Sequence, residues 1–323
     1  MRNFRRILVI RLSSFGDVVL TYNFLKELKK TFPDTEIHFL VKEKYKQLLE
    51  SFSFINKIIT VSPADSLLNI RKSLNVNRYD LVFDLSNHLK TRILTLFLPS
   101  RKVRFKKDYF KKFFLIYFKI NFFKDIIPVY KRYLLTLSKV AQNVSHRFVP
   151  LLENLNPQHL LFDKYIVLAP SAGHFTKTFP KELFAKLFEK FSSHFLGKIV
   201  LVGDNTPADL EICSYLEARL NNCINLCGKT DFKQLISLVF YSEFVVCNDS
   251  GILHLSEAMN KKTFVFFGST VKEFGFFPQL STTTVFENNE IGCRPCTKIG
   301  RSSCPKKHFN CMYGIKINSS VFK

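Results

Sequence analysis

Short apolar segments alternate with helix-like segments along most of this chain, and no other feature constrains its fold as strongly. In the first half the apolar segments lie at residues 7–10, 36–41, 57–61 and 81–85; in the second half they lie at 165–168, 198–202, 224–226, 244–247 and 263–267. Among the segments between them, 18–31, 63–74 and 181–192 are predicted to be helices. Strands that are apolar on both faces and joined by helices are typical of a parallel sheet covered on both sides. The pattern predicts an α/β protein.

The alternation starts again after residue 155, which predicts two domains, 1–155 and 156–323, joined by a linker at 150–157. A Cys-rich tail at 291–312 ends the second domain. Apolar residues make up 46% and charged residues 23% of the 323, a balance that excludes wholesale disorder. Because no apolar run reaches the roughly 20 residues of a spanning helix, and none precedes the first strand as a signal, we expect a cytoplasmic protein.

The net charge of +22 is concentrated in the first half. Residues 1–155 contain 29 Lys and Arg against 12 Asp and Glu, whereas residues 156–323 contain 19 against 14. Such asymmetry favours an anionic partner for the first half, which could be nucleic acid, a membrane surface or a phosphorylated substrate. A generally basic surface is the alternative.

The turn at 11–17 (RLSSFGD) follows the first strand, where ligands of open parallel sheets bind. Gly16 would permit close approach, and Asp17 would lie at a helix start. Asp17 is a candidate general base, although a simple helix cap explains it equally well. The turn lacks the Gly-Lys-Ser/Thr of a Walker loop.

Four loops of the second half follow strands and are expected to converge on one sheet edge. In 248–251, Ser250 and Gly251 would offer free N–H groups to an anion, Asp249 could accept from sugar hydroxyls, and His254 follows one turn later; capping with a core His is the alternative. Lys177 in 171–180 is a candidate phosphate contact, unless it is merely solvated. The loops at 203–204 and 228–230, which include Thr230, occupy equivalent positions.

The eight cysteines form two groups. Cys213, Cys223, Cys227 and Cys247 lie in apolar segments and are expected to be buried thiols. The tail carries Cys293, Cys296, Cys304 and Cys311. In a cytoplasmic protein this spacing favours a structural Zn over disulfides, with free or redox-active thiols and an iron–sulfur cluster as alternatives.

Residues 101–124 contain nine Lys or Arg and nine Phe or Tyr. Phe110, Phe113, Phe114, Tyr117 and Phe118 would share one helix face, beside Lys106, Lys107, Lys111 and Lys112. Such a basic amphipathic helix is typical of proteins that bind an anionic membrane surface. The alternative is that the aromatic face packs into the N-terminal core.

The motifs together resemble glycosyltransferase family 9, the heptosyltransferases of lipopolysaccharide core assembly. The resemblance is carried by 7–17, 79–92, 168–180, 248–258 and 266–270, and by the Cys293-Arg294-Pro295-Cys296 tail. It implies a GT-B fold, in which two Rossmann-like domains face a cleft. It further implies inverting transfer of heptose from ADP-L-glycero-D-manno-heptose to a Kdo- or heptose-bearing lipid A core, with no cofactor and no catalytic metal, by a peripheral protein at the cytoplasmic face of the inner membrane.

By the same resemblance, Asp17 matches the general base, with Ser13, Ser14 and Gly16 on the acceptor side. Lys177 matches the diphosphate-binding lysine, and Asp249, Ser250, Gly251 and His254 match the donor segment, to which we add Thr230. The chain departs from the family where Thr178 and Phe179 replace Arg and Trp, and where Asn23 replaces Pro. The ribose contact stays open among Asn205, Asp209 and Glu211.

Two other functions stay open at this stage. A family member could transfer a different sugar in surface-glycan assembly. A basic nucleic-acid-binding protein is the non-enzyme alternative, although no reader motif is present and no nucleic-acid partner is expected.

Overall fold

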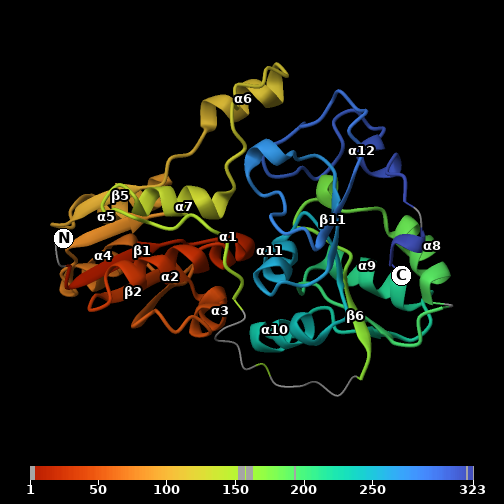
Figure 1. Cartoon of the computed structure of the whole chain (residues 1–323), viewed down its shortest axis with the longest axis horizontal. Coiled ribbons are helices and arrows are strands. Elements are labelled where there is room, and N and C mark those ends of the chain that lie inside the picture. Colours follow the sequence, from red (N-terminus) through yellow and green to blue (C-terminus); the bar gives the residue numbers. More distant parts are fainter. Residues whose placement is uncertain (1–3, 152–156, 158–162, 193, 318, 323) are drawn as a thin grey trace. The chain divides into compact units, whose positions relative to one another are not determined.

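The computed structural model describes residues 4–151, 157, 163–192, 194–317 and 319–322, so most of the predicted linker lies outside the described residues. The chain divides into two compact units (Figure 1). The first unit comprises residues 1–108 and 127–155, and the second comprises 109–126 and 156–323. The change of unit at 155 coincides with the predicted domain boundary. Residues 109–126, which we expected in the first domain, group instead with the second unit.

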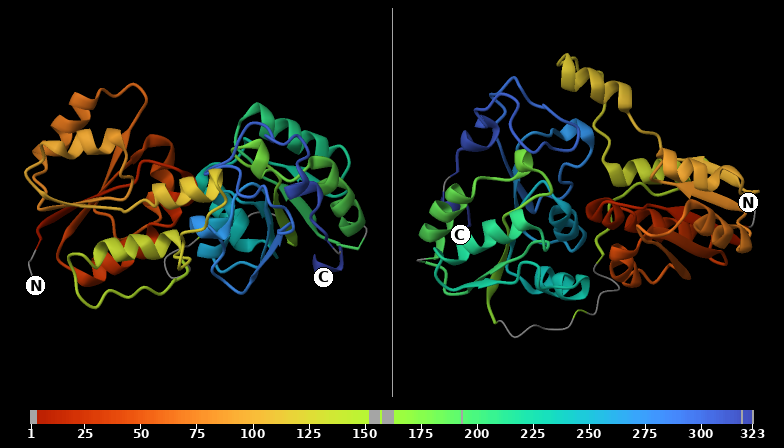
Figure 2. Two further views of the ribbon diagram at one scale, coloured as in Figure 1. Left: turned by 90° about the horizontal axis from the view of Figure 1, so that it is seen from above. Right: turned by 180° about the vertical axis from the view of Figure 1, so that it is seen from behind.

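The first unit is built on a five-stranded parallel sheet with the strand order β3-β2-β1-β4-β5. Its strands are β1 (Arg6–Ile10), β2 (Glu36–Lys42), β3 (Lys57–Val61), β4 (Leu81–Asp84) and β5 (Arg101–Arg104). Its helices are α1 (Phe15–Val19), α2 (Tyr22–Thr31), η1 (Glu43–Tyr45), α3 (Lys46–Glu50), α4 (Leu67–Val76), α5 (Leu89–Leu96) and α7 (Val129–Leu137). Helices α2 and α7 pack together, as do α4 and α5, and Figure 2 shows the two pairs on opposite faces of the sheet.

The predicted helix at 18–31 is two helices in the structure. The break lies at Thr21, whose hydroxyl donates to the carbonyl of Val18 at 2.6 Å and competes with the helical ladder there. The helix predicted from residue 63 begins only at Leu67, because the Ser66 hydroxyl caps it by accepting the N–H of Asn69 at 3.1 Å. The edge strand β5 was missed, since its sequence RKVR is mostly charged and only Val103 is buried.

The second unit is built on a six-stranded parallel sheet with the order β11-β10-β9-β6-β7-β8. Its strands are β6 (Tyr165–Ala169), β7 (Lys198–Leu201), β8 (Cys223–Asn225), β9 (Val245–Asn248), β10 (Thr263–Phe267) and β11 (Thr283–Glu287). Its helices are α6 (Tyr109–Tyr117), η3 (Phe175–Lys177), α8 (Lys181–Ser192), α9 (Pro207–Glu217), α10 (Phe232–Tyr241), α11 (Gly251–Ala258), η4 (Lys272–Phe274), α12 (Asn310–Tyr313) and η5 (Ser319–Phe322).

Phenylalanine rings fill the core of the second unit. Phe179 stacks on Phe266 with ring centroids 4.2 Å apart, and Phe184 meets both rings edge-on. These side chains come from α8, from the loop before it and from β10, so the core fixes the β6 loop against the sheet. No helix among the described residues is both long and apolar enough to span a membrane.

Each sheet has one point where the order of strands reverses direction along the chain. In the first unit this point lies between β1 and β4, and in the second between β6 and β9. The loops after two such strands part to opposite faces of the sheet and leave room for a ligand at the carboxyl edge. The fold therefore directs attention to the loops that follow β1, β4, β6 and β9.

Candidate active site

The turn after β1 holds the buried carboxylate of Asp17. Asp17 Oδ2 lies 2.6 Å from Arg11 Nη2 and accepts from the backbone N–H and the hydroxyl of Ser14, at 3.1 and 2.8 Å. Asp17 Oδ1 has a longer contact, 3.3 Å from the hydroxyl of Tyr133 in α7. Asp17 thus caps the start of α1, which confirms the capping interpretation. The geometry leaves Oδ1 as the less engaged oxygen.

The charge of Asp17 is stabilised by its neighbours. Burial by itself would raise the pKa of Asp17, but the Arg11 guanidinium and the hydrogen bonds from Ser14 outweigh it and hold the pKa below its usual value. Burial raises the pKa of the Tyr133 hydroxyl, and the adjacent carboxylate adds to the effect, so Tyr133 is a neutral donor. At neutral pH the site therefore contains a carboxylate, a guanidinium and a phenol.

The loop after β4 is joined to this turn across the point of strand reversal. Arg11 Nη1 donates to the carbonyl of Leu85 at 2.8 Å, and the N–H of Leu12 donates to the hydroxyl of Ser86 at 2.9 Å. The neighbouring carboxylate of Asp84 is bonded within its own loop, by the N–H of Asn87 and the hydroxyl of Thr91. Asp84 therefore shapes the loop, while Arg11 and Asp17 form the charged group at the sheet edge.

The predicted acceptor-side residues lie in this turn. Ser14 is exposed, Ser13 is half-buried, and Gly16 is buried within α1. Their roles toward an acceptor stay predictions. Asn23, which replaces a family Pro, is buried in α2 and its side-chain oxygen accepts the N–H of Val149 at 2.7 Å. Asn23 thereby fastens the segment that leads out of the first unit.

In the second unit, Lys177 and Asp249 form a buried ion pair across the second point of strand reversal. Lys177 Nζ lies 2.9 Å from Asp249 Oδ2, and the hydroxyl of Thr270 donates to the same oxygen at 2.5 Å. These three residues follow β6, β9 and β10, so three neighbouring loops meet there. The contact confirms that the predicted loops 171–180 and 248–251 converge, and the loop after β10 joins them. Asp249 holds the ammonium group in place.

The start of α11 offers further polar groups beside this pair. Ser250 occupies the N-cap position of α11 without a capping hydrogen bond from its side chain, Gly251 begins the helix, and His254 is buried one turn later. The hydroxyls of Ser250 and Ser269 are buried without a hydrogen-bond partner among the described residues. A buried hydroxyl without a partner is costly, and a bound oxyanion would supply one. These groups could therefore hold a phosphate.

The loops after β7 and β8 also meet. Contacts in and near them help to choose among Asn205, Asp209 and Glu211 as the ribose contact. The N–H of Gly228 donates to the carbonyl of Gly203 at 2.9 Å, in the stretch that leads to the half-buried Thr230. Gly228 has a φ of +69°, and a Cβ there would lie 3.2 Å from Asn205. Thr206 caps α9 by accepting the N–H of Asp209, whose carboxylate accepts in turn from the Thr206 hydroxyl, and Glu211 pairs with Lys181. Asn205 is exposed at the loop edge and is the candidate least committed to such contacts.

The departures from the family pattern have structural explanations. Thr178 stands where the resemblance led us to expect Arg, and its hydroxyl closes the β6 loop by accepting the N–H of Ala172 and donating to the carbonyl of His174, both at 3.2 Å. Phe179 stands where we expected Trp and is buried in the core. Its N–H donates to the side chain of Asn248 at 2.9 Å. Neither substitution disturbs Lys177.

The four tail cysteines are near one another without forming a metal cage. The pKa of Cys296 is raised, first by burial and then by Cys293 and Cys304, and burial raises the pKa of Cys311 to about 12. Among the described residues, which include all four, no three Cys, His, Asp or Glu side chains are close enough to hold a metal ion. The geometry does not fit a bound zinc, so no step below uses one. Metal analysis of the purified protein, which should find about one metal per chain if the prediction holds, tests it.

Sequence reasoning missed three residues of these clusters. Arg11 and Thr270 lie in segments already noted, 11–17 and 266–270, but their side chains carried no signal of a partner. Tyr133 lies 116 positions from Asp17, and no local pattern could have paired them.

Comparison with known proteins bears on what these clusters do. The model of glycosyltransferase family 9 (heptosyltransferase) matches residues 67–307, which is well over half of the chain. The chain belongs to glycosyltransferase family 9. It is therefore a transferase, and the predicted resemblance is confirmed. The non-enzyme alternative is set aside.

Relatives and solved structures agree with this assignment. The chain is 26% identical to lipopolysaccharide heptosyltransferase 1 of Campylobacter coli over 293 residues, 82% of this chain and 84% of the relative. It is 27% identical to lipooligosaccharide heptosyltransferase 2 of Campylobacter jejuni over 315 residues, 93% and 91% of the two chains. The structure of E. coli heptosyltransferase WaaC with ADP superposes with a TM-score of 0.71 at 19% identity, covering 87% of this chain and 92% of that one. The predicted GT-B class, two Rossmann-like parallel-sheet domains, is confirmed.

Proposed function

We propose that this family 9 transferase moves heptose from ADP-L-glycero-D-manno-heptose to a Kdo- or heptose-bearing lipid A acceptor in the inner core of lipopolysaccharide. The reaction inverts the anomeric centre and needs no metal. The observation that carries the proposal is a buried pair of opposite charges at the strand reversal of each sheet, Arg11–Asp17 and Lys177–Asp249, in a chain of this family. The acceptor is lipid-borne, so the protein works as a peripheral protein at the cytoplasmic face of the inner membrane.

On the donor side, Lys177 supports the leaving group. When the bond between the anomeric carbon and ADP breaks, negative charge builds on the diphosphate, and a held ammonium group stabilises it. Asp249 and Thr270 keep Lys177 in place, while Ser250, Ser269 and the first N–H groups of α11 supply hydrogen bonds. Related solved structures support this choice of donor, since they include E. coli WaaC with ADP and with ADP-2-deoxy-2-fluoro heptose.

On the acceptor side, Asp17 is the general base. The acceptor hydroxyl oxygen forms the new bond to the anomeric carbon, and its proton passes to Asp17 Oδ1, the oxygen whose only described contact is the 3.3 Å one to Tyr133. Arg11 keeps the carboxylate ionised and oriented through Oδ2. Because that pairing lowers the pKa, Asp17 is a weak base that acts as the new bond forms.

Product analysis tests the proposal. The protein is incubated with ADP-heptose and a truncated core acceptor, and mass spectrometry should show one added heptose; anomeric coupling in the NMR spectrum reports inversion. Parallel reactions with UDP- and GDP-sugars test the alternative of another sugar, and a reaction with EDTA tests metal independence. Turnover of a UDP- or GDP-sugar with none of ADP-heptose would overturn the donor assignment.

A further inference from the structure

Helix α6 and the residues that follow it expose large aromatic side chains. Phe110 and Phe118 are 66% and 58% exposed, and Phe113, Tyr117 and Phe122 are also exposed. The alternative of an aromatic face packed into the N-terminal core is therefore wrong for these side chains. A contiguous group of exposed aromatic rings marks an interaction site in a soluble protein.

The rings form a preassembled cluster. Half-buried Phe114 lies at its centre, with ring centroids 4.5 Å from Phe110 and 5.4 Å from both Phe118 and Phe122. Phe113 adds a ring 4.9 Å from Tyr117. We call Phe110, Phe113, Phe114, Tyr117, Phe118 and Phe122 the aromatic cluster. Because the rings already pack on one another, little side-chain freedom is lost when the cluster meets a partner.

The polar groups of the same segment hold it to the second unit. Lys119 Nζ donates to the carbonyls of Cys293 and Pro295 at 2.9 and 2.7 Å, and Asn121 donates to Glu273 at 3.2 Å. Lys112 Nζ lies 5.1 Å from the ring centroid of Phe274. A solvated amphipathic helix buries its apolar face and exposes its lysines; here lysines anchor the segment while the aromatic cluster is exposed. From the sequence we expected Lys112 to face a membrane, but in the structure it contacts Phe274 of the second unit.

The charge of the segment points to an anionic partner. Residues 109–126 contain four lysines, Lys111, Lys112, Lys119 and Lys124, against the single acidic residue Asp125, a net charge of +3. Lys106 and Lys107 lie just before the segment, separated from it by Asp108, which pairs with Arg132 at 2.7 Å. Two copies meeting through this face would bring like charges together, which disfavours self-association. An anionic lipid surface offers both a negative potential and an apolar layer for aromatic rings.

We propose that the aromatic cluster inserts into the interface of an anionic lipid bilayer and is the docking surface of this protein. The proposed function supplies only the reason to visit a membrane, namely a lipid-borne acceptor. The physical match is independent of it: rings enter the boundary between headgroups and acyl chains, while lysines around them attract anionic headgroups.

The absence of tryptophan from the chain allows a direct test. A Phe118→Trp variant carries one tryptophan, within the cluster, and a Leu68→Trp variant carries one at an equally exposed position on α4. Each is mixed with vesicles of phosphatidylcholine and phosphatidylglycerol, or of phosphatidylcholine alone. Phe118→Trp should shift its emission to shorter wavelength with the anionic vesicles and be quenched by brominated lipid, whereas Leu68→Trp should do neither.

Serine variants measure what the rings contribute. Phe110→Ser/Phe118→Ser should lower partition into anionic vesicles by about tenfold or more, since two large apolar side chains no longer leave water. Leu68→Ser/Val76→Ser removes two exposed apolar side chains from α4 and should bind as the parent does. Because all four positions are exposed, each variant should keep its thermal stability.

Three results would overturn the proposal. If Phe118→Trp sediments with vesicles but its emission wavelength does not shift, the docking surface lies elsewhere. If the protein does not bind vesicles at all, it has no such docking surface. A shift that grows with protein concentration without lipid identifies a second copy as the occupant. Vesicle binding with no transfer of heptose contradicts only the proposed function, so the two failures are distinguishable.

Discussion

The two ends of the first sheet carry the same chemical pair in different surroundings. At the amino end, Arg6 and Glu36 begin β1 and β2 and lie 2.6 Å apart, with side chains 24% and 46% exposed. At the carboxyl end, Arg11 and Asp17 follow β1 at the same 2.6 Å, with side chains 12% and 11% exposed. The two pairs have the same charges and the same distance between their charged atoms, so what distinguishes them is how deeply each is buried.

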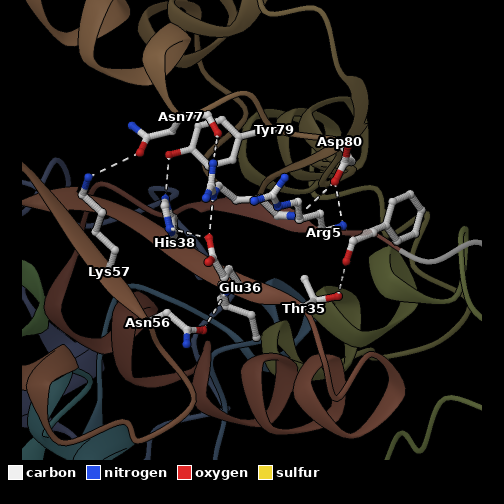
Figure 3. A network of polar contacts seen from close by, with 12 residues as sticks. Arg5, Thr35, Glu36, His38, Asn56, Lys57, Asn77, Tyr79 and Asp80 are labelled. Carbon is white, nitrogen blue, oxygen red and sulfur yellow. Dashed lines mark hydrogen bonds and ion pairs between the residues drawn. The ribbon is translucent and has the colours of Figure 1, made fainter.

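The amino-end pair belongs to a network that fastens strand starts. Figure 3 shows Asp80, just before β4, accepting the N–H groups of Arg5 and Arg6 at 2.7 and 2.9 Å. His38 Nδ1 lies 3.0 Å from the hydroxyl of Tyr79 in the same network. Its members are spread over β1, β2 and the approach to β4, and each contact ties neighbouring chain segments together. Its role is structural.

The carboxyl-end pair joins the turn after β1 to the loop after β4, yet this does not explain why two charges are buried there. Taking an ion pair out of water costs free energy that an apolar pair of similar size would not. The Arg11–Asp17 pair also lies where the strand order reverses and ligands bind. We therefore attribute its retention to chemistry, and the predictions below test this difference between the two ends.

The largest expected effect is on Asp17. Asp17→Ala should lower turnover by about 10²–10⁴-fold while the folded protein keeps its ADP affinity, because a general base is lost. It should also lower stability, since it leaves the Arg11 guanidinium unpaired. Steady-state transfer assays and calorimetry with ADP measure both. The matched control is Glu36→Ala at the amino end, which should leave turnover unchanged. If Asp17→Ala turns over substrate nearly as fast as the parent, Asp17 is not the general base, and the two charge pairs do not differ in catalytic role.

The second prediction concerns the arginines. Arg11→Met should destabilise the protein by about 3–5 kcal/mol, since it leaves the buried Asp17 carboxylate unpaired. It should also raise the pKa of Asp17 and move the acidic limb of the pH–rate profile to higher pH, because only the hydrogen bonds from Ser14 then oppose the effect of burial. Urea unfolding and pH–rate profiles are the measurements.

Arg6→Met is the control for Arg11→Met. The side chain of its partner Glu36 is 46% exposed, so the loss of stability should be much smaller and the pH–rate profile should not move. Equal losses from the two arginine variants would mean that burial does not distinguish the ends.

The sequence predicted the repeated architecture well, because apolar strands and punctuating residues are local signals. The strands at 57–61 and 263–267 and the helix at 181–192 have the predicted bounds. The sequence reading missed β5, whose residues are mostly charged, and also α5. The segment 109–126 was assigned to the wrong side of the boundary, since Lys119 reaches carbonyl groups 174 and 176 positions away. Long-range contacts of this kind leave no trace in a local pattern.

The candidate site was predictable where it lies in one short segment. Asp17, Lys177 and Asp249 each follow a predicted strand, and the rule that strands end at a common edge brought Lys177 and Asp249 together. We expected Asp249 to accept from sugar hydroxyls. That its carboxylate instead orients Lys177 depends on side-chain directions, which the sequence does not give. Tyr133 was beyond prediction, because only the packing of α7 on α2 places it.

The third prediction extends the contrast to the second unit. Lys177→Ala should weaken ADP binding by about tenfold or more and slow transfer, because one charge-assisted contact to the diphosphate is lost. Lys181→Ala is the control: Lys181 pairs with Glu211 at 2.5 Å, but the Glu211 side chain is largely exposed. Calorimetry should show parent-like ADP affinity in the control. Unchanged affinity in Lys177→Ala would exclude the proposed contact.

The smallest expected effect belongs to the amino-end network and concerns pH. Burial, with Arg6 and Lys57 adding to it, lowers the pKa of His38 to about 4, while Glu36 opposes them. In the unfolded chain His38 binds a proton below about pH 6.5, whereas in the folded protein it binds one only below about pH 4. Folding stability should therefore fall as pH drops from 6.5 toward 4, by about 1–2 kcal/mol for this residue.

A second buried group titrates in the opposite sense, so the raw pH profile of the parent cannot isolate His38. Burial raises the pKa of Glu257 to about 7, against hydrogen bonds from Leu280 and Gln279, and this favours folding as pH drops below 7. The informative quantity is the difference between the parent and His38→Gln in urea unfolding at pH 7 and pH 4.5. His38→Gln should lose less stability than the parent on acidification, whereas His146→Gln, a surface control, should follow the parent. An identical loss in His38→Gln and the parent would show that the amino-end network tolerates a charged His38, and that burial does not govern this end of the sheet.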